Sequence, residues 1–579
     1  MRQLTALDAQ FLHVECATTT AHVAGLAILD PADGSVSRES LAALLRQRIH
    51  LSPALFLRLA PVPWGLDRPY WVAGPAPDID DHLFETVLPA PGDHRRLAEE
   101  VARIHARRLD RTRPLWEMHL IRGLAGGLVA VYTKVHHAAI DGVSGAETLA
   151  ALLDLTPTPH RPVPPPAGTT PAAGPDGTRS GKVGGPQPTT GERAGDDNAP
   201  QPTTDQRAGD NTPQPTTGGR AGMDGGPADA GPGAGQMVVG AVVRSVTYPV
   251  RAVAAAVRAA GDLDAIPLVS TLPGAGLIAR AARMVTRDSR SRPALPALTP
   301  PRTPLNGPIS ARRHLAFGSV PLKDVKKAAR AHGVSVNDVV MTLCATALRS
   351  WLAERDALPD QPLVVAVPVA VRKTGTEDGT ETASGTGSGT ASGTGTATGS
   401  RTASGTGTAT GTRTRGGATV GNRISAMVVP LPTNVADPVE RLRRTGEAMR
   451  AAKRRFAVAP ARWVGDLCSL LPAPLTELAT PAIFRLASVA FPPINLIISN
   501  VPGPQFPLYL CGGRVLSYYP LSVLTDLTGG VNITCFSYDG MLDFGVVACP
   551  ERMDDVWGLL GHLQRALDEL PTAEDGPTA

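Results

Sequence analysis

The fold of this chain is indicated most clearly by VAVYTKVHHAAIDGVSGAETLAALLDL, residues 129–155. The β-branched and apolar residues up to Val135 predict a strand, which delivers His136 and His137 at its end. Gly142 permits a tight turn, and the apolar residues that follow it at helical spacing predict a helix. Successive residues of a strand point to opposite faces, so only one of the two histidines can face a given cleft.

The order His136, His137, Asp141, Gly142 at one strand end favours a catalytic site. A lone histidine is more often structural than catalytic, but few structural demands require two imidazoles, a carboxylate and a glycine in that order. Imidazole titrates near neutral pH, which suits a general base. A metal site stays open as an alternative, although the sequence shows no third or fourth ligand at a characteristic spacing.

Residues 1–156 have the pattern of one mixed α/β unit. Residues 37–49 and 93–109 carry apolar side chains at helical spacing. Residues 21–29 and 127–135 are short apolar runs, rich in β-branched residues and bounded by glycine or proline, that predict strands. Because helices and strands alternate, we expect an α/β fold.

Two segments of biased composition hold much of the 60 glycines and 55 prolines. Residues 157–236 repeat PQPTT three times and lack the apolar side chains needed to bury a core, which predicts a disordered linker. Residues 375–417, nearly all Gly, Thr, Ser and Ala, interrupt two apolar runs at 363–372 and 422–431. They predict a loop insertion, which a fold tolerates because loop-closure entropy grows slowly with length.

The overall composition gives no argument for a nucleic-acid partner, since the net charge is only +4 over 579 residues. The six cysteines are scattered without metal-ligand spacing, which suits reduced thiols in a cytosolic protein. Asp8 falls where a secretory signal would need its apolar core, and no run reaches the roughly 20 apolar residues of a membrane-spanning helix. We therefore expect a cytoplasmic protein.

The segment at 237–300 predicts amphipathic connector helices. Arg244, Arg251 and Arg258 recur every seven residues among Val and Ala, which places cations along one stripe. Two interpretations stay open. The helices connect domains and pack their apolar side on the body, or their basic amphipathic surface lies on a lipid interface.

HHAAIDG (136–142) resembles the HHxxxDG motif of coenzyme A-dependent acyltransferases and of peptide-synthetase condensation domains. Further segments resemble one bacterial family, the wax ester synthase/diacylglycerol acyltransferases, and their order along the chain matches it. These segments are LDAQFLHVE (7–15), DRTRPLWEMHLI (110–121), VNDVVMTLCATALRSWL (336–352), VPVAVR (367–372), GNRISAMVVPLP (421–432), NLIISNVPGP (495–504) and GGVNITCFSYDGMLDFGVVAC (529–549). The resemblance covers nearly everything outside the two biased segments.

This resemblance implies two α/β domains of the chloramphenicol acetyltransferase-like kind, at 1–156 and 301–572, with a central tunnel between them. It implies transfer of a fatty acyl group from acyl-CoA, as co-substrate, to diacylglycerol or to a fatty alcohol. No permanently bound cofactor and no metal is implied. Because the substrates are lipids, we expect peripheral association with an inner-membrane or lipid-droplet surface.

The resemblance also implies roles for single residues. His137 would be the general base and His136 a supporting residue. Asp141 would organise its loop through a salt bridge, for which Arg372 is the candidate partner.

Four further motif residues are candidates for the tunnel. Trp116 shapes the acyl channel or packs in the core, and Asn500 belongs to a turn after a strand. Asn337 and Asp338 either face the active site or serve the helix start, where Ser335 has the pattern of an N-cap.

Two other functions stay open. The chain acylates a carrier-bound substrate as condensation domains do, or it is a non-catalytic lipid-surface binding protein that keeps the fold.

Overall fold

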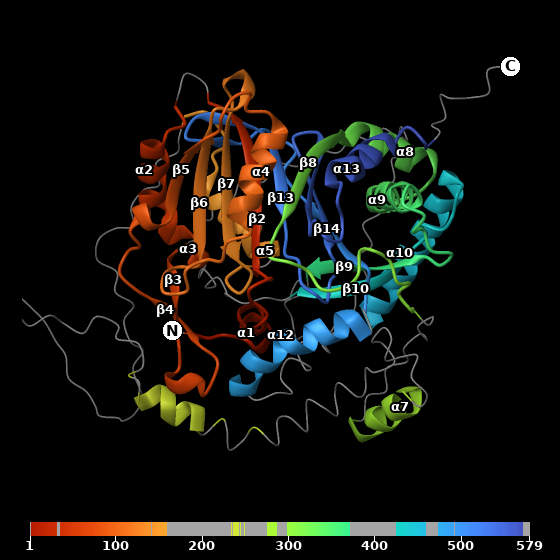
Figure 1. Ribbon diagram of the computed structural model, residues 1–579. Coiled ribbons are helices and arrows are strands. Elements are labelled where there is room, and N and C mark those ends of the chain that lie inside the picture. The colour runs from red at the N-terminus through yellow and green to blue at the C-terminus, as the bar shows by residue number, and fades with distance from the viewer. Residues whose placement is uncertain are drawn as a thin grey trace, which may run out of the picture. The chain divides into compact units, whose positions relative to one another are not determined.

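The computed structural model describes residues 2–31, 35–140, 142–158, 298–370, 424–458, 473–490 and 493–570, together with residues 233, 235–242, 244, 248 and 275–286. The predicted insertion at 375–417 lies outside these described residues. The predicted linker at 157–236 does so as well, apart from residues at its two ends. The described strands form two six-stranded sheets and one three-stranded sheet (Figure 1).

The first six-stranded sheet is built mainly from the N-terminal part of the chain. Its strands, in spatial order, are β12 (Tyr509–Leu510), β13 (Gly513–Leu521), β2 (His22–Asp30), β7 (Val129–His136), β6 (Trp116–Arg122) and β5 (Leu83–Val87). The predicted strands at 21–29 and 127–135 are confirmed as β2 and β7, which pair antiparallel with His22 opposite His136.

The second six-stranded sheet comes from the C-terminal part. Its strands, in spatial order, are β10 (Ile424–Leu431), β9 (Leu363–Ala370), β11 (Leu496–Pro502), β14 (Val531–Tyr538), β15 (Met541–Ala548) and β8 (His314–Pro321). β14 and β15 form a hairpin whose turn residues, Asp539 and Gly540, both have positive φ. The Asp-Gly pair favours this turn because both residues tolerate left-handed backbone. A small sheet adds β1 (Arg2–Gln3), β4 (Tyr70–Ala73) and β3 (Leu57–Ala60).

Two strands from the C-terminal part of the chain, β12 and β13, belong to the first sheet. Residues 509–521 follow β11 in the C-terminal part, yet β13 pairs antiparallel with β2 and so extends the N-terminal sheet. Strand β13 also packs against β14 and β15 of the second sheet. Residues 1–156 therefore do not complete the first sheet by themselves, because β12 and β13 from the range 301–572 supply two of its strands.

Helices cover the sheets. The α-helices are α1 (Ala6–His13), α2 (Arg38–Arg48), α3 (Pro53–Phe56), α4 (His94–His105), α5 (Gly142–Leu152), α7 (Ala275–Thr286), α8 (Leu322–Ala331), α9 (Val336–Ala353), α10 (Pro438–Val458), α12 (Ala473–Ala490) and α13 (Val556–Arg565). The predicted helices at 37–49 and 93–109 are confirmed as α2 and α4. Ser37 and Asp93 cap them by accepting hydrogen bonds from backbone amides three residues later.

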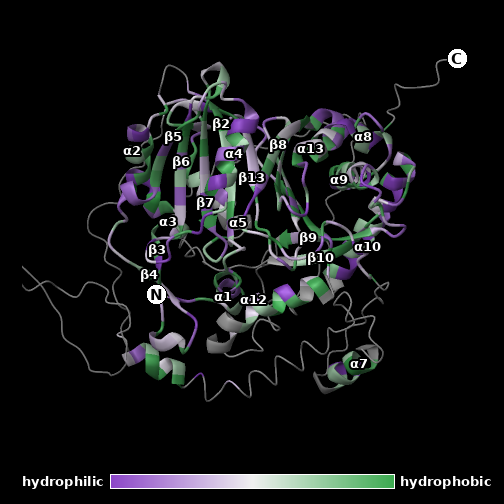
Figure 2. Cartoon of the chain, in the orientation of Figure 1, coloured by the Kyte–Doolittle hydropathy of each residue, from purple (hydrophilic) through white to green (hydrophobic). Residues whose placement is uncertain are grey.

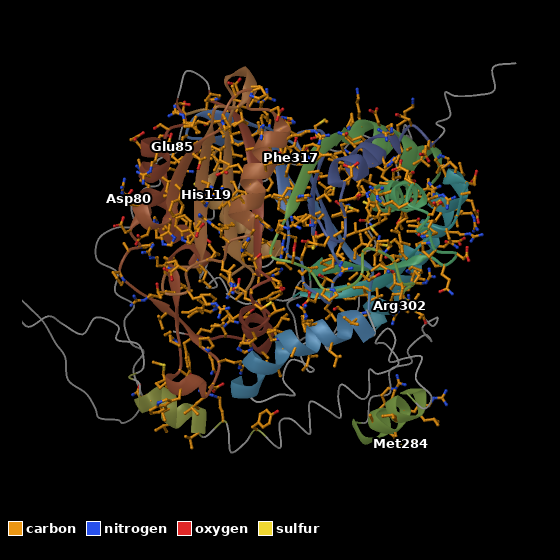
Figure 3. All side chains as sticks on the ribbon, in the orientation of Figure 1. Asp80, Glu85, His119, Met284, Arg302 and Phe317 are labelled. Carbon is orange, nitrogen blue, oxygen red and sulfur yellow. The ribbon has the colours of Figure 1, made fainter. Side chains whose placement is uncertain are left out.

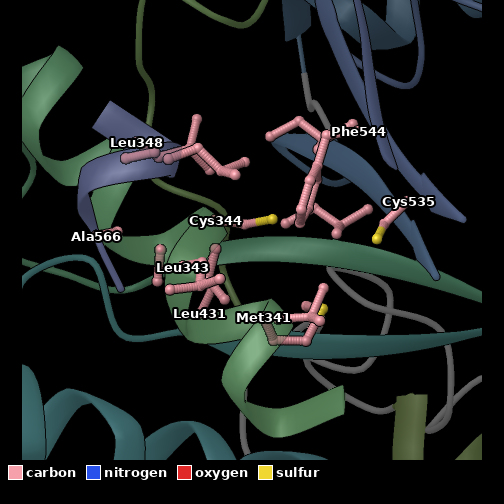
Figure 4. Packing of buried hydrophobic residues seen from close by; sticks show 14 of the residues in the cluster. Met341, Leu343, Cys344, Leu348, Leu431, Cys535, Phe544 and Ala566 are labelled. Carbon is pink, nitrogen blue, oxygen red and sulfur yellow. The ribbon is translucent and has the colours of Figure 1, made fainter. Parts of the chain in front are cut away.

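The largest apolar cluster surrounds α9, which is buried along most of its length. Figure 4 shows residues of this cluster, among them Cys344 and Leu348 of α9 and Cys535 and Phe544 of the second sheet. Figure 2 shows that apolar residues follow the strands of both sheets. A helix that is apolar on nearly all sides is expected where neighbouring elements enclose it.

Within the connector, Arg244 contacts the N-terminal part of the chain. The guanidinium pairs with the Asp67 carboxylate and donates to the Tyr70 hydroxyl at 2.8 Å. Arg244 therefore joins the helix at 235–242 to Asp67 and to the first residue of β4, a contact with the body of the protein that the connector interpretation expects. Arg251 and Arg258 lie outside the described residues.

Candidate active site

The two histidines lie where β7 ends, and their main chain is held from both sides. The His136 amide donates to the Leu115 carbonyl at 2.9 Å, and the His137 amide donates to the Ala21 carbonyl at 2.8 Å. Ala139 then donates to the His136 carbonyl at 2.9 Å, which closes a turn. The adjacent strands β6 and β2 thus fix the backbone of the pair before any side chain is considered.

The His136 side chain is fully buried and serves this turn. Its Nδ1 atom accepts a hydrogen bond from the Ala138 amide at 3.0 Å. An accepting Nδ1 leaves the ring proton on Nε2, and Nε2 lies 3.5 Å from Glu15 Oε1. His136 therefore anchors Ala138, the residue that follows His137, through Nδ1, and its Nε2 faces the Glu15 carboxylate.

Glu15 completes this arrangement, and sequence reasoning assigned it no role. Its carboxylate accepts from the Ala21 amide at 2.9 Å and pairs with Arg111 at 2.9 Å. Burial, the largest single influence, would raise the pKa of Glu15. The opposing contacts with His136, Ala21 and Arg111 nevertheless hold it at about 2. The available signal was the Glu15 carboxylate at the end of the LDAQFLHVE segment and Arg111, three residues before Pro114.

His137 has a different environment from its neighbour. Its side chain is only half-buried, and its ring stacks on Phe11 of α1 with centroids 4.0 Å apart and planes 3° from parallel. The alternation of strand residues therefore separates a buried imidazole from an accessible one, as the sequence predicts.

Two predicted partners cannot be compared with the structure. Asp141 and Arg372 both lie outside the described residues, so the salt bridge between them stays a prediction. Gly142 is the first residue of α5. The helix predicted after the histidine pair is thereby confirmed.

Trp116 lies in a packed core. Its side chain is buried, its indole nitrogen donates to the Leu55 carbonyl at 2.8 Å, and its ring stacks on His82 with centroids 4.4 Å apart. Both the polar and the apolar parts of the indole thus contact the protein interior, as expected of a tryptophan that packs in the core.

The remaining motif residues lie at the start of α9. Ser335 and Asp338 form a reciprocal capping box, which confirms the predicted helix start. Asn337 accepts through Oδ1 from Asn500 Nδ2 at 3.1 Å, which joins α9 to β11. The structure thus brings together two residues that are 163 positions apart in sequence.

A buried polar row lies behind the histidine pair on the face of β6 and β7 that is covered by α4. Lys134 is fully buried, pairs with Glu117 at 3.1 Å and donates to the Arg107 carbonyl at 3.0 Å. His119 also pairs with Glu117 at 3.1 Å, and it lies within the first sheet (Figure 3). Burial lowers the pKa of both Lys134 and His119. The row ties the C-terminal end of α4 to the strand that carries the histidines.

No three His, Cys, Asp or Glu side chains among the described residues converge to hold a metal ion. Within the same residues no helix is both long and apolar enough to span a membrane.

Known proteins resemble this chain over nearly its whole length. A candidate diacylglycerol O-acyltransferase of Mycobacterium tuberculosis is 30% identical over 578 residues, which cover 99% of this chain and 91% of that protein. A similarly named protein of Mycobacterium bovis is 30% identical over 569 residues, which cover 98% of each chain.

The fold and the family agree with these relatives. The wax ester synthase/diacylglycerol acyltransferase of Marinobacter aquaeolei has a TM-score of 0.57 and 24% identity over 98% of each chain, so the two share a fold. Residues 4–340 match the wax ester synthase/diacylglycerol acyltransferase catalytic domain, and residues 420–571 match the C-terminal domain of this family. The chain therefore belongs to the wax ester synthase/diacylglycerol acyltransferase family, whose members share this mixed α/β fold.

Proposed function

We propose that this protein transfers a fatty acyl group from acyl-CoA to diacylglycerol and so forms triacylglycerol, with His137 as general base. One observation carries the assignment of the base. The His137 side chain is half-buried and stacks on Phe11, whereas His136 is fully buried, with Nδ1 accepting from the Ala138 amide and Nε2 3.5 Å from Glu15 Oε1. Of the two imidazoles, His137 is therefore the one whose side chain reaches the protein surface.

The reaction needs a base because an alcohol is a weak nucleophile at neutral pH. His137 removes the hydroxyl proton of the acceptor as its oxygen attacks the thioester carbonyl. The tetrahedral intermediate collapses, the carbon–sulfur bond breaks, and the CoA thiolate takes the proton from the His137 imidazolium. The products are the ester and CoA, and the base returns to its starting form without an acyl-enzyme.

His136, Glu15 and Arg111 act through the main chain and do not touch substrate. His136 holds the Ala138 amide, which directly follows His137, and Glu15 holds His136. Such support matters because a base displaced by about 1 Å can lose roughly a hundredfold in rate.

Acyl-CoA is the co-substrate, and the acceptor comes from a lipid phase. A fatty alcohol is the second candidate acceptor, since the name of the Marinobacter protein includes wax ester synthesis. Peripheral contact with a membrane or lipid-droplet surface would supply either acceptor.

Thin-layer analysis of lipids formed from labelled acyl-CoA with diacylglycerol or hexadecanol tests this function. His137→Ala should abolish ester formation and stay folded, whereas the exposed His50→Ala should behave as wild type. His136→Ala should lower the melting temperature and keep measurable activity. Wild-type rates in His137→Ala would contradict the assignment of the base, and absence of any ester from the wild type would contradict the function.

A further inference from the structure

Helix α12 exposes an apolar face to its surroundings. Ile483, Leu486 and Val489 recur every three residues, and their exposed fractions are 50%, 70% and 55%. This spacing places them on one side of the helix. Among the described side chains of α12, Arg485 is the only charged group, and it is exposed as well.

The side of α12 that packs on the protein carries small polar residues. Thr476, Thr480 and Ser488 are almost fully buried. Thr480 donates to the Gln10 side chain of α1 at 3.2 Å, and Ser488 donates to the Arg485 carbonyl at 2.7 Å. An ordinary surface helix buries its apolar stripe and shows its polar side to water. On α12 this pattern is reversed, so its outer face is not built for water.

The chemistry of this face fits a lipid surface. It combines aliphatic side chains with one arginine, which can reach phosphate groups, and it shows no carboxylate among its described side chains. The helix cannot cross a membrane. An apolar stripe on such a helix instead lies in the plane of the interface, with its side chains at the boundary of the acyl chains.

The inner contact of α12 leads to the active site. Gln10, which binds Thr480, precedes Phe11 in α1, and Phe11 stacks on His137. Figure 1 shows α12 beside α1, and the contacts between the two helices agree with this view. Helix α1 therefore contacts both α12, which carries the exposed apolar face, and His137, the proposed base.

We propose that the outer face of α12, formed by Ile483, Leu486 and Val489, docks on a phospholipid surface, and that α1 holds this docked helix next to His137. The delivery of a lipid acceptor to His137 rests on the proposed function, whereas the docking of α12 on a phospholipid surface does not. The lipid acceptor then reaches the catalytic histidine from the surface to which the protein is bound, without crossing water.

Cosedimentation with vesicles of phosphatidylcholine and phosphatidylglycerol tests the docking. The double variant Leu486→Glu/Val489→Glu should bind the vesicles at least roughly tenfold more weakly. Each substitution removes an aliphatic side chain whose transfer from water to the lipid surface favours binding, and puts a charge in its place. The control Val87→Glu changes an equally exposed valine, 67% exposed on β5, and should bind as wild type. The apolar exchange Leu486→Phe should also keep binding.

The two proposals fail separately. His137→Ala should bind vesicles as wild type while forming no ester. The α12 double variant should lose activity on diacylglycerol in vesicles and keep activity on diacylglycerol dispersed in detergent, which supplies the acceptor without a phospholipid surface. Its melting temperature shows whether it folds, and Leu486→Ser replaces it if it does not.

Unchanged vesicle binding by the folded double variant, or by Leu486→Ser in its place, would overturn the docking surface. A change of oligomeric state in place of lost binding would overturn it too, because a second copy of the chain would then be the occupant.

Discussion

The rings of Phe11 and His137 lie parallel, with centroids 4.0 Å apart and planes 3° from parallel. Four residues further along the same segment, Glu15 faces His136 across 3.5 Å. The stretch from α1 to Glu15 therefore supplies one neighbour to each histidine: an aromatic face for the accessible ring and a carboxylate for the buried ring. The two imidazoles are held by different physical interactions from a single short segment.

The Phe11 stack gives the first prediction. Phe11→Leu should lower kcat roughly tenfold, because an aromatic pair contributes about 0.5–1.5 kcal/mol beyond its buried area and orients the base. Steady-state kinetics with saturating acyl-CoA measures this effect. Phe84→Leu is the matched control, since Phe84 stacks on His119 at 4.9 Å away from the reacting residues. Equal kcat values for the two variants would contradict an orienting role for Phe11.

Glu15 gives a prediction for stability. Its folded-state pKa is lowered from 4.5 to about 2, so its ionised form stabilises the protein above pH 4.5 and this stabilisation is lost as the pH falls to about 2. Glu15→Gln should reduce the free energy of unfolding by about 3 kcal/mol at neutral pH and by much less as the pH approaches about 2. Urea titrations at several pH values measure the difference.

The control for Glu15 is Glu99→Gln, because Glu99 forms an exposed ion pair with Arg96 on α4. Exposed pairs contribute little, so this variant should unfold like the wild type. A loss in Glu15→Gln that does not depend on pH would contradict the ionic origin of the stabilisation.

Asp543 gives a prediction of opposite sign. This buried carboxylate accepts from the Ser319 hydroxyl at 2.6 Å and from the Tyr518 amide at 2.7 Å. Burial raises its pKa from 3.8 to about 6 in spite of both bonds. The folded protein therefore holds the proton more tightly than the unfolded chain, and this group lowers stability as the pH rises from about 4 to 6.

Asp543→Asn should remove that pH dependence. Its amide oxygen can accept from Tyr518 while its NH₂ group donates to Ser319, so both contacts survive. The variant should gain about 3 kcal/mol over the wild type between the acid and the neutral end of this window. Chemical unfolding at both ends measures it. The exposed Asp356→Asn is the control and should show no gain that grows with pH. If the free energy of unfolding of Asp543→Asn differed from that of the wild type by the same amount at all pH values, the raised pKa of Asp543 would not be the cause.

The insertion at 375–417 gives a prediction about the fold. It lies between β9 and β10, whose facing ends pair Ala370 with Ile424. A hairpin with paired ends needs only a short loop, and shortening a long loop costs little because closure entropy changes slowly with length. Deletion of 375–417 should leave both the activity and the melting temperature close to wild type. Loss of activity in a folded deletion variant would show that the insertion takes part in function.

Local patterns in the sequence determined the helices, strands and turns and the position of the HHAAIDG motif. The strand before His136, the capping box of Ser335 and Asp338, and the Asp539-Gly540 turn all depend on neighbouring residues. Their physical causes are alternation, capping and backbone freedom, which act over a few positions. The same alternation predicts that His136 and His137 have different environments.

The tertiary structure decided what each of these groups meets. Arg111 pairs with Glu15 across 96 positions, and β13 joins β2 from the other end of the chain. A charge or a strand edge does not specify its partner by local periodicity. The partner is set by which groups the whole fold brings out of water together, because a buried charge is stable only where an opposite charge and hydrogen-bond donors meet it. The sequence by itself therefore determined the histidine pair, and only the fold decided which ring is buried on Glu15 and which is stacked on Phe11.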